Sequence, residues 1–103
     1  MRTTLITLLT GAALAAGAVP ASAGTPCADL HGGFETDIYA TNLSCPAALK
    51  VVRKWHRKAV NQGQGAGDKY VGDFACLSFD EGPEHVSVRC ADGRRKIRFY
   101  AGP

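Results

Sequence analysis

Cysteine spacing constrains this chain more than any other feature of its sequence. An even number of cysteines in a short exported chain is typical of a disulfide framework, which stabilises domains whose apolar core is small. Four cysteines allow three connectivities, and the sequence alone leaves all three open. We expect two neighbouring pairs, because each joins adjacent elements and the second can bridge a hairpin: Cys27 with Cys45, and Cys76 with Cys90.

The first 23 residues have the three parts of a cleavable export signal. Arg2 supplies a positive start, residues 5–19 are apolar, and Ala21-Ser22-Ala23 gives a small-residue cleavage site. The apolar stretch is shorter than the roughly 20 residues that a bilayer needs. We therefore expect a signal peptide at 1–23 and a single secreted domain at 24–103. After cleavage we expect a monomer with no integral membrane segment.

Hydrophobic periodicity predicts one helix and four strands in the order β-α-β-β-β. In residues 34–41, alternation places Phe34, Thr36, Ile38 and Ala40 on one face of a strand and Glu35, Asp37 and Tyr39 on the other. Residues 42–60 have helical spacing, and Ser44 is the expected N-cap. Three more strands are expected at about 70–79, 84–91 and 95–100, with Asp92-Gly93 as a hairpin turn.

These elements predict a small two-layer α+β domain, in which the helix packs on one face of an antiparallel sheet. The inward positions expected from the alternation lie on the last three strands and the helix. They are Phe74, Cys76, Val86, Val88, Cys90, Ile97, Phe99, Val52 and Trp55.

Three short motifs resemble those of a group of small secreted actinobacterial proteins of uncharacterised function. They are a Ser-Cys-x-x-Ala helix start at 44–48, Gly-x-Phe-x-Cys at 72–76 and Val-x-Cys at 88–90. The likeness spans roughly residues 36–99. It implies export and this fold, and it favours joining Cys27 to Cys45. It does not indicate any particular activity.

A basic helix face is the candidate binding surface. The possible anion-binding residues are Lys50, Arg53, Lys54, Arg57 and Lys58, and the same surface could continue through Arg89, Arg94, Arg95, Lys96 and Arg98. Such a face fits cell-wall phosphodiesters, acidic lipid headgroups or nucleic acid. It also fits a solvated helix surface, because the chain has 12 Lys and Arg against 9 Asp and Glu.

Catalytic and metal-binding motifs are weak in this sequence. A small nuclease or hydrolase would use His85 with Glu81 or Glu84, or His56, but nothing in the spacing fixes their geometry. The sequence contains neither the Cys-x-x-Cys nor the His-x3-5-His pair that is typical of zinc sites. We therefore expect no metal or other cofactor.

We therefore expect a secreted, non-enzymatic domain that binds an unknown extracellular protein or a cell-envelope polymer. Loops 61–69 and 80–84 are long enough to contact a protein partner. Polyanion binding through the helix face, and hydrolysis by His85 with a carboxylate, are the two alternatives.

Overall fold

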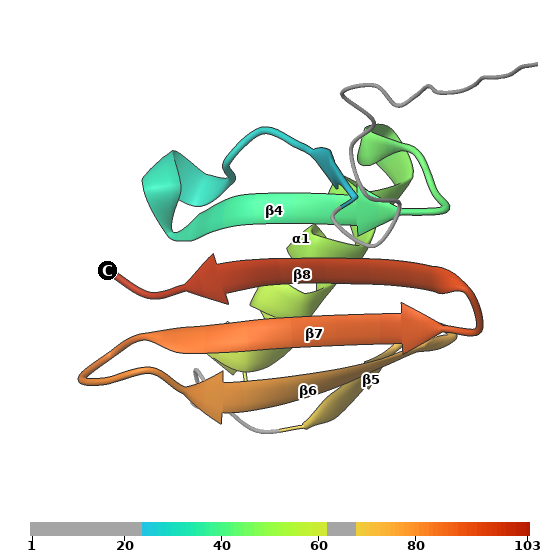
Figure 1. The fold of residues 1–103 in the computed structure, drawn as a ribbon. Helices are drawn as coiled ribbons and strands as arrows, with labels where there is room; N and C mark the ends of the chain where they lie inside the picture. The colour runs from blue at the N-terminus through green and yellow to red at the C-terminus, as the bar shows by residue number, and fades with distance from the viewer. Residues whose placement is uncertain (1–23, 62–67) are drawn as a thin grey trace, which may run out of the picture.

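The structure is a computed structural model that describes residues 24–61 and 68–103. In this part of the chain one helix packs on a six-stranded antiparallel sheet, which confirms the α+β class (Figure 1). The sheet order is β3-β4-β8-β7-β6-β5. The element bounds are β3 (Thr25–Pro26), the 3-10 helix η3 (His31–Gly33), β4 (Glu35–Thr41), α1 (Cys45–Asn61), β5 (Lys69–Val71), β6 (Phe74–Asp80), β7 (Val86–Asp92) and β8 (Arg95–Ala101). The signal peptide expected at 1–23 lies outside the described residues, as does most of loop 61–69.

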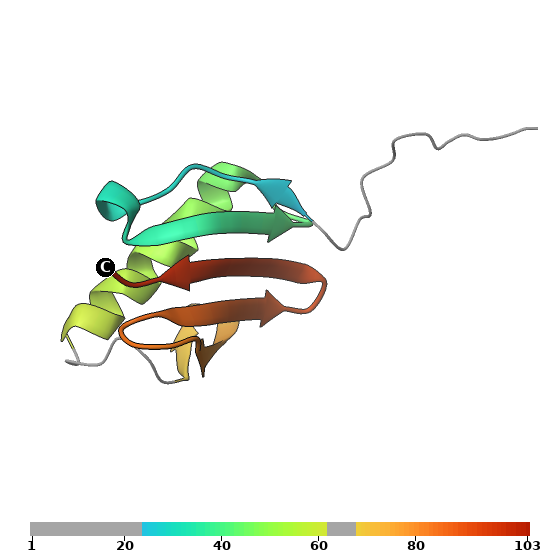
Figure 2. The same cartoon turned by 60° about the vertical axis from the view of Figure 1, so that its left-hand side comes forward.

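Helix α1 covers one face of the sheet, and no described element covers the other (Figures 1 and 2). Its buried stripe consists of Ala48, Val52, Trp55 and Ala59. Trp55 is fully buried and meets the ring of Phe99 edge-on, with the centroids 5.1 Å apart. All nine inward positions predicted from the alternation are buried, so the core lies between α1 and one sheet face. No described helix is long and apolar enough to cross a membrane.

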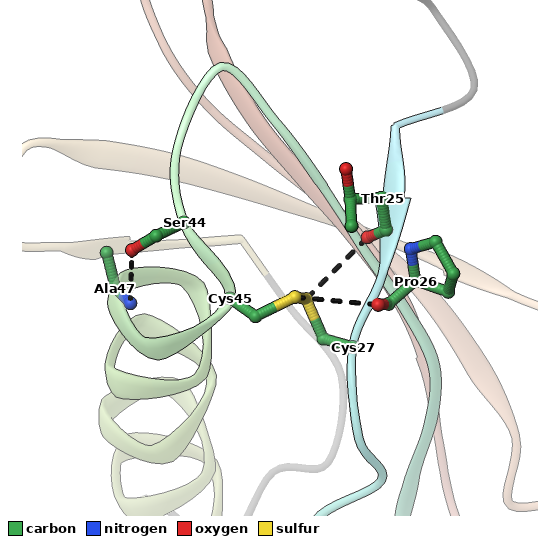
Figure 3. The surroundings of a disulfide bond; sticks show 6 residues. All are labelled: Thr25, Pro26, Cys27, Ser44, Cys45 and Ala47. Atoms are coloured by element: carbon green, nitrogen blue, oxygen red, sulfur yellow. Dashed lines mark hydrogen bonds between the residues drawn. A yellow bond between two sulfur atoms is a disulfide. The ribbon is translucent and has the colours of Figure 1, made fainter. Parts of the chain in front are cut away.

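The helix begins as the sequence predicts. The backbone N–H of Ala47 donates to the Ser44 hydroxyl at 3.3 Å, which satisfies one of the free amides of the first turn (Figure 3). Pro46 lies in that turn, where its missing N–H does no harm. The first helical residue, Cys45, is thereby held in place for its disulfide.

Both predicted disulfides are confirmed. Cys27 joins Cys45, linking the segment after β3 to the start of α1 (Figure 3). Cys76 joins Cys90, which lies directly opposite it on the neighbouring strand. The described chain therefore has no free cysteine. Disulfides of this kind form and persist in oxidising compartments.

The strand expected at 70–79 is instead a tight hairpin. Val71 pairs with Phe74, and the turn between them contains Gly72 with φ of +60°. Glycine adopts this backbone conformation without steric cost, so the chain reverses where the alternation alone suggested continuity. The short strands β5 and β3 extend the sheet from the four predicted strands to six.

A β-bulge reverses the alternation at the start of β4. The pairing of β4 with β8 is irregular between Thr36 and Tyr39, and Asp37 has φ of +51°. An extra residue in a strand shifts the preceding side chains to the other face. The expectation that Glu35 faces away from the core is therefore wrong, because Glu35 is fully buried on the helix side with Ile38.

Candidate functional site

The buried carboxylate of Glu35 is the centre of a polar cluster between the sheet and the helix. Nδ1 of His31 lies 2.6 Å from Oε1, and Nδ1 of His56 lies 2.5 Å from Oε2. Three elements supply these groups: η3 carries His31, β4 carries Glu35 and α1 carries His56. Each carboxylate oxygen thus has its own imidazole partner, which offsets the cost of burying the carboxylate.

The two imidazole rings are stacked on one another. Their centroids are 3.8 Å apart and their planes differ by 14°. Phe34 packs edge-on against the His56 ring, with the centroids 5.2 Å apart. The side chain of His31 is 36% exposed and that of His56 is 21% exposed, so solutes reach the rings but not Glu35.

The hydrogen-bond geometry sets the tautomer of both rings. A carboxylate only accepts hydrogen bonds, so each Nδ1 donates its hydrogen to Glu35. A carboxylate that orients an imidazole in this way is typical of metal-ligating histidines and of histidine bases. The arrangement therefore provides two oriented nitrogen bases beside a buried anion.

Sequence reasoning placed these three residues separately. His31 precedes the strand predicted at 34–41, Glu35 was predicted on the outer face of that strand, and His56 falls within the helix predicted at 42–60. Their spacings, 4 and 21 residues, match no metal-ligand motif, and Glu35 turns inward only because of the bulge at Asp37. The available signal was the His-x3-Glu spacing before a strand, which is common and weak by itself.

The uncovered sheet face is the second candidate site. A row of residues crosses it from β4 to β6: Tyr39 pairs with Arg98, Arg98 with Arg89, and Arg89 with Leu77. A groove of about 390 Å³ runs along this row, and Lys96 also lines it. Exposed aromatic rings flank the row, among them Phe79 and Tyr100.

Arg89 and Arg98 are like charges directly opposite each other, an arrangement that destabilises a sheet. Within the described chain neither guanidinium makes an ion pair. Instead, Arg98 lies 4.4 Å from the ring centroid of Tyr39 and Arg89 lies 5.3 Å from that of Phe79. The two cations thus contact aromatic rings, and the nearby described carboxylates of Asp37 and Glu81, which line a shallow hollow beside them, form no ion pair with either one.

The predicted basic residues of the helix lie on the other side of the molecule. The side chains of this group are all exposed on the surface of α1 away from the sheet: Lys50, Arg53, Lys54, Arg57 and Lys58. Because α1 covers the opposite face, these cations do not join Arg89 and Arg98 in one patch (Figure 2). The basic residues of the helix and the Arg89–Arg98 pair are therefore two separate groups of cations.

The predicted catalytic group around His85 lies in the turn between β6 and β7, where the backbone N–H of Glu81 donates to the carbonyl oxygen of His85 at 3.0 Å. Oε2 of Glu81 accepts a hydrogen bond from the Ser87 hydroxyl at 3.0 Å. No described ion pair or hydrogen bond joins the exposed His85 ring to Glu81 or Glu84.

No protein-family model, curated protein or solved structure matches this chain. The likeness to small secreted actinobacterial proteins therefore stays a prediction based on the three motifs.

Proposed function

We propose that this protein is an exported, non-catalytic domain that binds a phosphodiester polymer across the open face of its sheet. The observation that carries the proposal is the Arg89–Arg98 pair, which lies in a groove without a carboxylate partner among the described residues. Binding a polyanion relieves the repulsion between the two guanidinium groups. Arginine also recognises phosphate oxygens through two parallel hydrogen bonds.

Aromatic side chains beside the arginines support the same ligand. Antiparallel sheets with exposed aromatic rings and interspersed cations are a recurring surface for single-stranded nucleic acid. Tyr39 and Phe79 stack under the two guanidinium groups, and Tyr100 lies exposed on the same face. A phosphodiester chain would place its phosphates against the arginines and its flat or apolar groups against the rings.

The helix face is the weaker of the two basic surfaces. Lys50, Lys54 and Lys58 lie at i, i+4 spacing, and no exposed Phe, Tyr or Trp occurs on α1. The helix therefore offers charge alone, as a solvated helix surface does. The sheet face combines charge, aromatic rings and a groove, and for this reason we assign binding to it.

Salt-dependent binding of phosphodiester oligomers tests this assignment. The variant Arg89→Ala/Arg98→Ala removes two cations from the sheet face, and the control Arg53→Ala/Arg57→Ala removes two from the helix. Fluorescence anisotropy with a labelled 12-mer of deoxythymidine, over a range of salt concentrations, gives the slope of log K against log salt. On a single strand each lost phosphate contact lowers the magnitude of that slope by about 0.7, so we expect a drop of about 1.4 for the sheet variant and none for the control.

An abasic oligomer of the same length identifies the source of the phosphodiester. Equal affinity for both oligomers indicates a base-free polymer such as a polyol phosphate of the cell wall. A preference for the thymidine oligomer of about 1–3 kcal/mol per stacked base indicates nucleic acid. Loss of binding in the helix variant alone would transfer the function to the helix face, and absence of binding to both oligomers would refute the proposal.

Export and lack of catalysis belong to the same proposal and have their own tests. The leader pattern at 1–23 and the two disulfides support secretion. Intact-mass measurement of the protein from culture medium should give a chain beginning at Gly24 with no free thiol. Cleavage of either oligomer by wild-type protein, abolished in His85→Ala, would contradict the non-catalytic assignment.

A further inference from the structure

We propose that His31, Glu35 and His56 form a binding site for a divalent first-row transition-metal ion. The inference is independent of the sheet face, because this cluster lies on the helix side of the sheet. One ligand atom from each of the three residues lies within 4.8 Å of the other two. The chain therefore brings three candidate ligands from three separate elements to one place.

The donor set selects the class of ion. Two imidazoles with one carboxylate suit Zn²⁺, Co²⁺, Ni²⁺, Cu²⁺ and Fe²⁺, whereas Mg²⁺ and Ca²⁺ prefer oxygen ligands alone. Three protein ligands also leave a coordination position open to water or another ligand. The half-exposed rings of His31 and His56 face solvent, so an ion has access to the cluster.

Metal binding requires only small changes in the distances between the ligand atoms, although one ring must also turn. Around a tetrahedral zinc ion with bonds of about 2.0–2.1 Å, neighbouring ligand atoms are about 3.3 Å apart. The present Nδ1 to Oε distances of 2.6 and 2.5 Å therefore lengthen by less than about 1 Å. Each imidazole that coordinates through Nδ1 then carries its hydrogen on Nε2.

The ring stack opens when an ion binds. A metal–nitrogen bond lies in the plane of its imidazole, so two face-to-face rings cannot both direct Nδ1 at one ion. His31 is the ring that we expect to turn, because its side chain is 36% exposed against 21% for His56. Metal binding should therefore unstack His31 from His56, and this structural change is measurable.

Backbone strain on both sides of Glu35 supports a functional role. His31 and Asp37 both have positive φ, at +53° and +51°. Such conformations are unfavourable for non-glycine residues and cluster at functional sites. The first directs an imidazole at Glu35, and the second forms the bulge that turns Glu35 inward. Two independent departures from regular backbone thus build the same cluster.

Calorimetric titration with ZnCl2 tests the site, using untagged, oxidised protein stripped with a chelator. We expect one Zn²⁺ per chain for the wild type. His31→Asn keeps a residue that tolerates positive φ, and its matched control is His85→Asn, the same change at an exposed histidine. Loss of a hydrogen-bond partner outside the coordination sphere already lowers metal affinity about 10- to 100-fold. His31→Asn and His56→Gln remove a ligand itself, so the Zn²⁺ affinity of each variant should fall by at least as much. His85→Asn should bind as the wild type does.

Nuclear magnetic resonance of the histidine rings keeps the test decisive if a variant fails to fold. In the wild type, Zn²⁺ should shift the ring signals of His31 and His56 and remove the contacts between their stacked rings, leaving His85 unchanged. Cobalt substitution should give the visible absorption of a four-coordinate site. No heat and no ring shift at millimolar Zn²⁺ would overturn the proposal, as would stoichiometric binding that survives both substitutions.

Discussion

Substitutions at Glu35 and its two histidine partners test whether this cluster is needed for the stability of the fold. Glu35→Ala removes a fully buried carboxylate and leaves two imidazoles without their partner. Breaking a buried charged cluster from one side typically costs about 3–5 kcal/mol. A domain of about 80 residues has a free energy of unfolding of only about 4–12 kcal/mol. The single substitution should therefore remove about a quarter or more of the stability.

Replacing the whole cluster with residues that need no polar partner should give the opposite result. In Glu35→Met/His56→Leu/His31→Asn, the buried positions become apolar and the left-handed position keeps a tolerant residue. Apolar replacement of a complete buried ion cluster is often neutral or stabilising by about 1–4 kcal/mol. We expect the triple variant to be at least as stable as the wild type.

Urea denaturation measures both effects through the fluorescence of Trp55, the only tryptophan in the chain. The slope of unfolding free energy against urea should stay constant, so that a shift in midpoint reports stability. A triple variant as unstable as Glu35→Ala would refute the reasoning, since the cluster would then be part of the structural core. A stable triple variant means that the cluster is dispensable for folding, as a ligand site is.

Two further predictions concern the scaffold. Cys76 and Cys90 are 14 residues apart, and the chain-entropy model predicts that Cys76→Ala/Cys90→Ala lowers the free energy of unfolding by about 3 kcal/mol. A change below about 1 kcal/mol in urea denaturation would rule out this contribution of the disulfide. Gly102 has φ of +145°, and a Cβ there would lie 2.1 Å from the Glu84 carbonyl oxygen, so Gly102→Ala should cost about 1–3 kcal/mol. Wild-type stability of that variant would mean that the C-terminal contact does not hold in solution.

Most of the core was predictable because it depends on local periodicity. The helix stripe with Trp55, the Ser44 cap and the β7–β8 hairpin follow from spacing and turn chemistry that neighbouring residues determine, although the two-residue turn is 93–94 and not the predicted 92–93. The pairing of Cys76 with Cys90 then followed from the hairpin. These features need no knowledge of how distant segments meet.

The candidate sites were not predictable because both depend on long-range register. Glu35 faces His56 only when β4 has its bulge and α1 lies across that end of the sheet. The Arg89–Arg98 pair is formed by strand register, whereas the sequence indicated these residues only as a possible continuation of the basic helix face. A residue such as Asp37 tolerates positive φ, but nothing in the neighbouring sequence indicates that it adopts it.

Chemical-shift mapping of the oxidised protein during titration with the thymidine 12-mer tests the central claim most directly. The account predicts that amide and guanidinium signals change along the row formed by Tyr39, Arg98, Arg89 and Leu77, while the exposed residues of α1 keep their positions. Changes confined to the helix cations, with an unaffected sheet face, would contradict it.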